Sequence, residues 1–334
     1  MSQPQARVRP DRGSAASPPR LVKVSEIVVG PILLLVLVNL VSCGRGNVSS
    51  GNHDRLDADA IGKAAGTKTM TTEVGTVGIR WLRDDVKVTV DKMPVNPVAG
   101  LASVAAFHPT QSGAIVMGDM IVFQDEVTPA MDAALKNGLE VTGLHNHFAF
   151  DEPKVYFMHI GGSGTSEKLA AGVKAVWDAI KDVRKNNPQP ADSFPGNVPD
   201  SKGSINAKEI EKTLGYKGRA QGGIVLVMIG REAQMQGVKI GESMGLSTTA
   251  AFSGSDEYAV VYGDFIMTGA EVQPVLKNLR EHAINIVALH NHMIGEEPAF
   301  YFAHFWGKGP AKELAQGIKA ALEAQRNASQ PGER

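Results

Sequence analysis

The feature that most constrains the fold of this chain is an internal repeat with a constant spacing of 145 residues. A Leu-His-Asn-His segment, a Glu-Pro pair and a further histidine follow one another in both halves. Six of the nine histidines fall in these two sets, which we call the first triad (His145, His147 and His159) and the second triad (His290, His292 and His304). A duplication over 334 residues predicts two similar domains.

The repeat and the composition of the intervening stretches divide the chain into six segments. The linker is rich in Asn, Pro, Asp, Ser and Gly, as connecting segments usually are. The predicted segments are a signal peptide over 1–42, a lipidated cysteine with a flexible tether over 43–55, a first repeat domain over 56–185, the linker over 186–204, a second repeat domain over 205–326 and a disordered tail over 327–334.

Each repeat combines strand and helix signals in the same order. In the first, the patterns predict helices over 57–65, 127–135 and 169–180 and strands over 75–90, 101–107, 114–123, 139–147 and 154–160. This order predicts an α+β fold, a tandem duplication of a mixed helix and strand unit with helices mainly on one face of a sheet. We expect the two domains to pack about a pseudo-twofold axis and to bury a sheet or helix face between them.

The N-terminus has the features of an export signal. Basic residues precede an apolar run over 27–41, and Leu40-Val41-Ser42-Cys43 follows. The run of about 15 residues is short for a membrane span, which needs about 20. The tetrapeptide resembles the lipobox of bacterial lipoproteins, which implies lipidation of Cys43 and a protein anchored on the extracytoplasmic face of the cell membrane. The alternative is an uncleaved anchor helix, against which Pro31 and Asn39 count.

Charge and cysteine content exclude some classes of protein. A formal net charge of −1, with Lys and Arg spread along the chain, gives no electrostatic basis for binding nucleic acid. A single cysteine excludes an internal disulfide, so the domains depend on their apolar cores.

The triads are candidate metal ligands. Residues two apart in a strand share a face, so His145 and His147 are expected to point the same way, beside the small residue Gly143. The third histidine and a nearby carboxylate (Glu152, or Glu297 in the second repeat) complete a set that suits zinc, iron, manganese or nickel. In the alternative, the histidines bond one another and the backbone in an interdomain core. Asn146 and Asn291 face away, and we expect them to bond neighbouring backbone.

Two further repeated features have both a structural and a functional interpretation, and a third has a structural one only. Asp119 and Asp264 either orient a histidine from behind or cap a turn. The glycine pairs that follow the third histidines (Gly162 and Gly164, Gly307 and Gly309) either bind an anion before a helix or form a tight turn. Two carboxylates at helix starts, Glu126 and Glu271, are explained by the helix dipole without any role in a site.

Two similar motifs can be set aside. The tripeptide His-Asn-His is not by itself the HNH nuclease motif, whose residues are spread over a ββα unit. His-x-His followed by Glu is similar to the first metal motif of cupins, but helices on both sides of the histidine strands disagree with an all-β jelly roll.

Taken together, the chain resembles the LppY/LpqO family of bacterial lipoproteins. The resemblance rests on MGDMIVFQDEVTPAM at 117–131, LEVTGLHNH at 139–147, EPKVYFMHIGGSG at 152–164 and, in the second half, VALHNH, EEPAFYFAHFWGKG and AKELAQGIKAAL. It covers essentially all of residues 56–325 and implies export and two domains, without an established reaction.

Three functions follow from these features. The first is a metal-dependent hydrolase of a small anionic substrate, with Glu152 and Glu297 as catalytic residues. The second is a lipoprotein that binds a metal or a small ligand without catalysis. The third is a structural module whose histidines pack at the interdomain interface.

Overall fold

The computed structural model describes residues 55–200 and 203–329. The predicted signal peptide, the predicted lipidation site Cys43 and nearly all of the tether lie outside the described residues. No helix within the described ranges is long and apolar enough to span a membrane.

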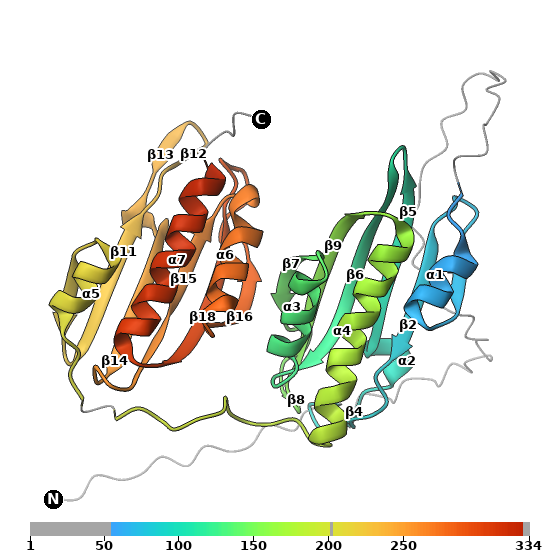
Figure 1. The fold of residues 1–334 in the computed structure, drawn as a ribbon, viewed down its shortest axis with the longest axis horizontal. Helices are drawn as coiled ribbons and strands as arrows, with labels where there is room; N and C mark the ends of the chain where they lie inside the picture. The colour runs from blue at the N-terminus through green and yellow to red at the C-terminus, as the bar shows by residue number, and fades with distance from the viewer. Residues whose placement is uncertain (1–54, 201–202, 330–334) are drawn as a thin grey trace, which may run out of the picture. The chain divides into compact units, whose positions relative to one another are not determined.

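The two halves contain the same elements in the same order (Figure 1). The first half consists of α1 (Ala58–Ala65), β1 (Thr69–Thr71), β2 (Val77–Leu82), β3 (Thr89–Val90), β4 (Met93–Pro94), α2 (Pro97–Gly100), β5 (Ala102–Thr110), β6 (Gly113–Phe123), α3 (Val127–Lys136), β7 (Glu140–His145), β8 (Asp151–Glu152), β9 (Val155–Gly164) and α4 (Ser166–Asn186). The second half consists of α5 (Ala207–Leu214), β10 (Gly218–Gln221), β11 (Ile224–Gly230), β12 (Ala233–Met235), β13 (Val238–Ile240), the 3₁₀ turn η1 (Glu242–Met244), β14 (Ser247–Gly254), β15 (Ala259–Met267), α6 (Gly269–Glu281), β16 (Asn285–His290), β17 (Glu296–Glu297), β18 (Tyr301–Gly309) and α7 (Ala311–Ser329). The predicted duplication of a mixed helix and strand unit is confirmed.

One antiparallel sheet of 12 strands runs through both halves. Its order is β1-β2-β5-β6-β9-β7-β16-β18-β15-β14-β11-β10. Counted inward from the two edges, the strands correspond in pairs, from β1 and β10 at the edges to β7 and β16 at the centre. The two half-sheets therefore have the same strand order and meet at β7 and β16.

The junction of the halves differs from the expected burial of a sheet or helix face. β7 pairs with β16 through Leu144 and Leu289, which occupy equivalent positions in the two repeats. Antiparallel pairing of equivalent residues is what a twofold axis between them produces. The halves join edge to edge because β7 and β16 would otherwise leave unpaired backbone groups at the ends of their half-sheets.

Side chains of α3 and α6 reinforce this junction from equivalent positions. Thr128 Oγ1 donates to Asn285 Oδ1 at 3.0 Å, and Gln273 bonds both the N–H and the C=O of Val141 at 3.0 and 2.8 Å. Arg280 adds a bidentate ion pair with Asp132 at 2.8 and 3.0 Å.

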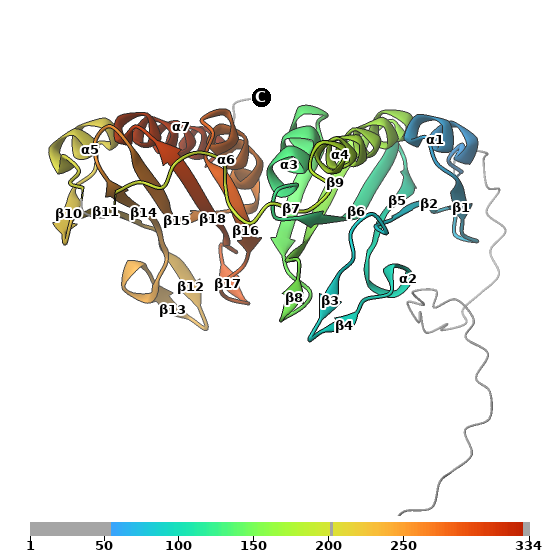
Figure 2. The same ribbon diagram turned by 90° about the horizontal axis from the view of Figure 1, so that it is seen from below.

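The longer helices cover one face of the sheet, as Figure 2 shows from the side. The main core between helices and sheet contains buried residues of both halves, including Leu144 and Leu289 at the junction. Long strands with one apolar face and amphipathic helices such as α4 and α7 bury their surfaces against each other. The predicted placement of helices on one face is confirmed.

Short strands project from the opposite face of the sheet, where they form the three-stranded groups β4-β3-β8 and β13-β12-β17 (Figure 2). A small core lies beneath each group. The strand predicted over 75–90 is confirmed only in part, since Val77–Leu82 and Thr89–Val90 form strands and the residues between them do not. Val86 and Val88 alternate as predicted but pack into the small core of the first half.

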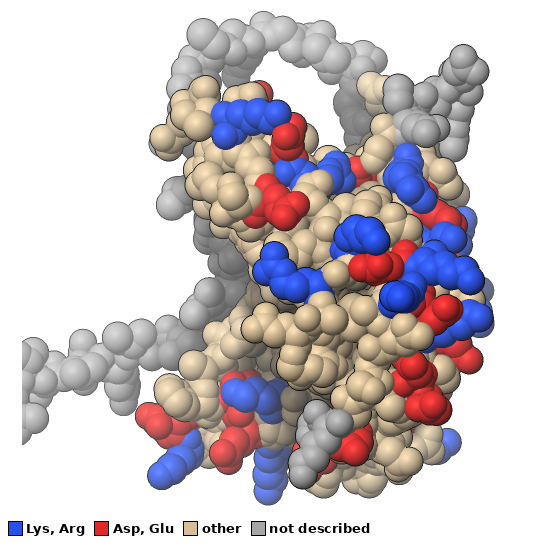
Figure 3. Space-filling view, turned by 90° about the vertical axis from the view of Figure 1, so that its left-hand side faces the viewer, with Lys and Arg blue, Asp and Glu red and all other residues tan. Residues whose placement is uncertain are grey.

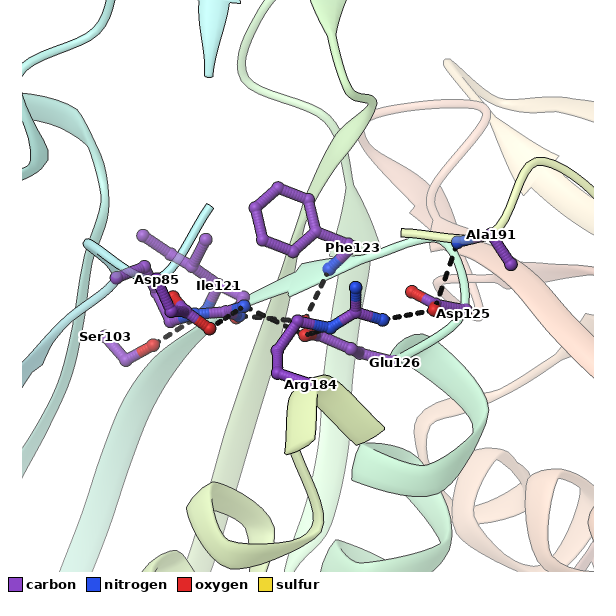
Figure 4. Close-up of polar contacts among 9 residues, drawn as sticks. Asp85, Ser103, Ile121, Phe123, Asp125, Glu126, Arg184 and Ala191 are labelled. Carbon is purple, nitrogen blue, oxygen red and sulfur yellow. Dashed lines mark hydrogen bonds and ion pairs between the residues drawn. The ribbon is translucent and has the colours of Figure 1, made fainter. Parts of the chain in front are cut away.

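A buried ion network ties α3 to the sheet. The fully buried Arg83 makes two hydrogen bonds to Glu126, at 2.8 and 2.9 Å. Arg184 also contacts Glu126 at 2.7 Å and bonds Asp125 (Figure 4). Burial raises the pKa of Glu126 despite the opposing effect of the Arg83 hydrogen bonds.

The second half repeats the ion pair with different neighbours. Arg231 bonds Glu271 at 3.1 and 3.2 Å, and Gln325 and Ser329 of α7 donate to the same carboxylate. Burial alone would raise the pKa of Glu271, but these hydrogen bonds hold it below its ordinary value. Both glutamates lie at helix starts as predicted. Their main partner is an arginine, fully buried at Arg83 and partly exposed at Arg231, which the dipole interpretation missed.

The described part of the linker is held by the second half. Lys308 Nζ donates to the carbonyl of Phe194 at 3.1 Å, and the hydroxyl of Tyr258 donates to the carbonyl of Asn197 at 3.1 Å. The final helix α7 continues to Ser329, three residues into the segment predicted as a tail.

Candidate metal centres

The structure brings the three histidines of each triad together. Within each triad the ligand nitrogens lie within 4.8 Å of one another. Each triad draws on the end of one strand (β7 or β16), the loop beyond it and the middle of the next long strand (β9 or β18). Among the described residues, the triads form two separate clusters, one in each half, and each could hold a metal ion.

Strand alternation decides which face of the sheet carries the triads. On β9, Met158 and Ile160 point into the main core under the helices, while Phe157 belongs to the small core on the other side. His159 therefore shares the face of Phe157. His145 pairs with Phe157 across the sheet, so it points to the same face. The triads lie on the face opposite the helices.

A small residue beside each triad makes room for an imidazole, as predicted. The ring that uses this space is the third histidine of the triad, whereas the prediction had placed the small residue beside the first two. Gly143 pairs with His159, and a Cβ at this glycine would lie 3.1 Å from His159 Cδ2. In the second half Ala288 pairs with His304 in the same way. A β-bulge between Val141 and Gly143 sets this register.

The middle histidine is positioned by an aromatic stack instead of a strand. β7 ends at His145, so His147 lies beyond the strand that was predicted to carry both. Its ring lies parallel to Phe157, with centroids 3.3 Å apart, and close to His145, with centroids 5.2 Å apart. Phe157 is a site residue that the sequence interpretation missed, and its only signal was the recurrence of phenylalanine at 302.

The asparagines between the first two histidines have the expected structural role. Asn146 Nδ2 donates to the carbonyl of Phe148 at 2.7 Å, and Asn291 Nδ2 donates to the carbonyl of Met293 at 2.6 Å. These bonds close the turn that brings His147 and His292 back over the sheet.

In both triads Nδ1 of the first and third histidines faces an acceptor. His145 Nδ1 lies 3.3 Å from the carbonyl oxygen of Asn146, and His159 Nδ1 lies 3.8 Å from Asp119 Oδ1. In the second triad the corresponding partners are the Asn291 carbonyl for His290, at 3.2 Å, and Asp264 for His304. Asp119 and Asp264 thus lie behind the third histidines, where a carboxylate orients a ligating ring.

The other ring nitrogens converge. His145 Nε2 lies 2.9 Å from His159 Nε2. Although His147 and His292 are exposed, partial burial of their rings lowers their pKa below the ordinary imidazole value, and neighbouring histidines add to the effect. Neutral imidazoles are the form that binds metal. Burial also raises the pKa of Asp119, against the opposing effect of the histidines, so a nearby cation would favour its ionised form.

The predicted carboxylates Glu152 and Glu297 are not brought into either cluster. Both are exposed, and each lies in a short strand that pairs with a projecting hairpin. The residues just before them, Asp151 and Glu296, are buried and accept hydrogen bonds from Val155 N–H at 2.7 Å and from Phe300 N–H at 2.9 Å. The inward-facing carboxylates of these loops are therefore structural.

The glycine pairs are also separate from the triads. All four glycines lie within β9 or β18 instead of a loop before a helix. A Cβ at Gly162 would lie 3.3 Å from Leu169 Cδ2, and one at Gly307 would lie 3.0 Å from Leu314 Cδ2. These two positions face the helices, on the far side of the sheet from the histidines, and their small size allows the close approach of α4 and α7.

Solved structures of low similarity include shell proteins of bacterial microcompartments. The trimeric shell protein PduB is 12% identical, with 79% of this chain and 93% of that chain covered at a TM-score of 0.20. EtuB from Clostridium kluyveri is 12% identical, with 77% and 90% covered at a TM-score of 0.19. Scores this low support no conclusion about fold or function. No curated protein matches the chain.

The family comparison agrees with the duplication. Two segments, residues 59–179 and 208–324, match one domain family, and together they cover more than half of the chain. The chain therefore belongs to the family described as Domain of Unknown Function (DUF1259), whose domain it contains twice.

Proposed function

We propose that each triad binds one divalent metal ion. The observation that carries this proposal is the 2.9 Å separation of His145 Nε2 and His159 Nε2, in rings whose Nδ1 atoms face acceptors. A neutral imidazole has one donor and one acceptor nitrogen, so in the tautomer with both protons on Nδ1, on the side of these acceptors, two Nε2 lone pairs face each other. A cation between the nitrogens converts this repulsion into coordination. Zinc, iron, manganese and nickel ions all accept imidazole ligands.

The exposure of the triads supports binding of a small anion at each metal. Three protein ligands are typical of sites that keep a further coordination position for water or a ligand. The middle histidines, His147 and His292, are exposed, so this position is open to solvent. Because neutral imidazoles leave the charge of a divalent ion uncompensated, the preferred ligand is an anion.

Hydrolysis of a small anionic substrate is a second candidate, favoured by the same open position. A divalent ion supplies a Lewis acid and lowers the pKa of water. The chain's own contribution would be to orient the rings through Asp119 and Asp264. The predicted catalytic residues Glu152 and Glu297 lie outside the ligand clusters. Binding without catalysis is therefore the function with the stronger support.

We further propose that the protein is a lipoprotein of the LppY/LpqO type, anchored through Cys43 on the extracytoplasmic face of the cell membrane. The support is the order of basic residues, the apolar run over 27–41 and Cys43, followed by a tether rich in Gly, Ser and Asn.

Nucleic acid is not among the proposed ligands. The formal net charge is −1. On the face drawn in Figure 3, Lys and Arg are interspersed with Asp and Glu, without the basic stripe that a phosphate backbone requires.

Metal analysis of the purified full-length chain tests the metal proposal. After equilibration with zinc and dialysis, we expect two zinc ions per chain, one in His145→Ala, one in His290→Ala and none in the double variant. His108→Ala is the matched control, since His108 lies outside both triads and bonds Thr76 Oγ1. Absence of stoichiometric metal, with a marked loss of thermal stability in the triad variants, would instead identify the histidines as structural.

A further inference from the structure

The register at the junction puts the two triads side by side on one face. Leu144 and Leu289 pair with each other and both point into the main core, so the histidines that follow them, His145 and His290, point to the opposite face. These two histidines are diagonal neighbours across an antiparallel pair, a relation that separates Cα atoms by about 7–8 Å.

The spacing of the strands sets the distance between the centres. The first triad lies above the line between the paired strands β7 and β9, and the second above the line between β16 and β18; we call these two lines the seams. These seams are two strand spacings apart, which amounts to about 10 Å. Metal ions that share a single bridging oxygen lie about 3.5–4 Å apart, so two ions in the triads would be too distant for that arrangement.

The residues that flank the Leu144–Leu289 pair on the triad face include two small ones. The one recorded pair between these strands is Leu144 with Leu289; continued by one residue on either side, this antiparallel register places Gly143 opposite His290 and Ala288 opposite His145. Gly143 also neighbours His159, and Ala288 neighbours His304. Apart from the triad histidines themselves, the residues of β7 and β16 at these positions are a glycine, over which the His159 ring lies, and an alanine, so no other large side chain of these two strands separates the centres.

From this geometry we propose that the two triads form one paired site for a dianionic ligand. One acidic group of the ligand binds at each metal, and a short spacer spans the junction of β7 and β16 between them. This inference rests on the proposed metal binding and adds the class of ligand, a molecule with two carboxylate or phosphate groups at its ends. The pseudo-twofold arrangement of the triads matches a ligand whose two ends are alike.

Calorimetry on the zinc-loaded full-length chain tests the pairing with α,ω-dicarboxylates of increasing length and with a monocarboxylate. We expect one dicarboxylate per two zinc ions, an affinity maximum at an intermediate length, and at that length binding at least about 100-fold tighter than the monocarboxylate. Two dicarboxylates per chain, or no length at which the affinity exceeds the monocarboxylate value, would overturn the proposal. These readouts use the wild-type protein and do not depend on the folding of a variant.

Variants provide the second arm. In His290→Ala, which keeps the first triad, the advantage of the best dicarboxylate over the monocarboxylate is expected to disappear, while His282→Ala retains it. His282 lies in the same half and bonds the Asn278 carbonyl, away from the triads. An undiminished advantage in His290→Ala contradicts the paired site. A wild-type chain that binds no zinc before any ligand is added contradicts the metal proposal itself, so the two failures are distinguishable.

Discussion

His147 lies face to face on Phe157, with ring centroids 3.3 Å apart and an angle of 7° between the planes. The second half repeats this contact between His292 and Phe302, at 3.5 Å and 4°. The middle histidine lies beyond the end of its strand, so the stack is the contact that fixes the direction of its ring. A ring held in one orientation loses less conformational entropy when it binds a metal.

Replacing Phe157 with leucine should therefore weaken metal binding at the first triad only. Leucine keeps the small core filled but removes the flat surface under His147. Aromatic contacts contribute about 0.5–1.5 kcal/mol, so we expect the zinc affinity of the first site to fall by up to about tenfold. Competition with a chromophoric chelator measures the two sites, and Phe302→Leu is the matched variant that should weaken the second site instead. Equal losses at both sites in either variant would contradict this local role.

Asp119 and Asp264 should affect metal affinity through the third histidines. Asparagine at either position keeps the shape but removes the charge that faces Nδ1 of His159 or of His304. Loss of such an orienting carboxylate typically costs about 10–100-fold in metal affinity. The same chelator competition should show this loss at the triad of the mutated half. Asp132→Asn, which alters an ion pair at the junction, should leave both affinities unchanged.

The lowered pKa of His147 and of His292 predicts a pH dependence for the metal-free protein. Burial disfavours the charged ring in the folded state, so the unfolded chain takes up protons at a higher pH. Stability is therefore complete above the ordinary imidazole pKa of about 6.5 and is lost as the pH falls from there through the lowered folded-state values. Thermal unfolding at pH 7.5 and pH 5.5 should show the loss. A variant with glutamine at both positions should show a smaller difference, and an equal difference would rule out these two rings as its cause.

The triads could be predicted from sequence because two independent signals agree on them. The 145-residue spacing shows which histidines recur, and the strand period separates His145 from its neighbour Leu144. The placement of the helices on one face of the sheet was also predictable. The long helices each have an apolar stripe and the strands have an apolar face, and these surfaces are buried by packing against each other.

The orientation of the carboxylates before the Glu-Pro prolines and the junction between the halves could not be predicted from the repeat and the strand period. Asp151 and Glu152 are adjacent in a strand of two residues, too short for a period to show which one turns inward. Only the pairing of β8 with β3, distant in sequence, leaves Glu152 exposed. Likewise, the repeat predicts two similar halves, but it does not reveal that β7 and β16 are the strands left with an open edge.

The arginines that pair with Glu126 and Glu271 give the last prediction, a difference in stability between equivalent positions. Replacing Arg83 with methionine removes the main partner of the fully buried Glu126, which keeps only its contact with Arg184 and the Phe123 N–H, and breaking a buried pair costs about 3–5 kcal/mol. The equivalent change at Arg231 should cost less, because the Arg231 side chain is 28% exposed and Gln325 and Ser329 still donate to Glu271.

Urea denaturation of both variants measures the two costs. Arg83→Met combined with Glu126→Gln should recover part of the loss, because an amide is less costly to bury than an unpaired carboxylate. Burial raises the pKa of Glu126, so the cost of Arg83→Met should also shrink as the pH falls and the carboxyl takes up a proton. Costs of equal size at Arg83 and Arg231, independent of pH, would mean that packing of the arginine side chain, and not its charge, provides the stabilisation.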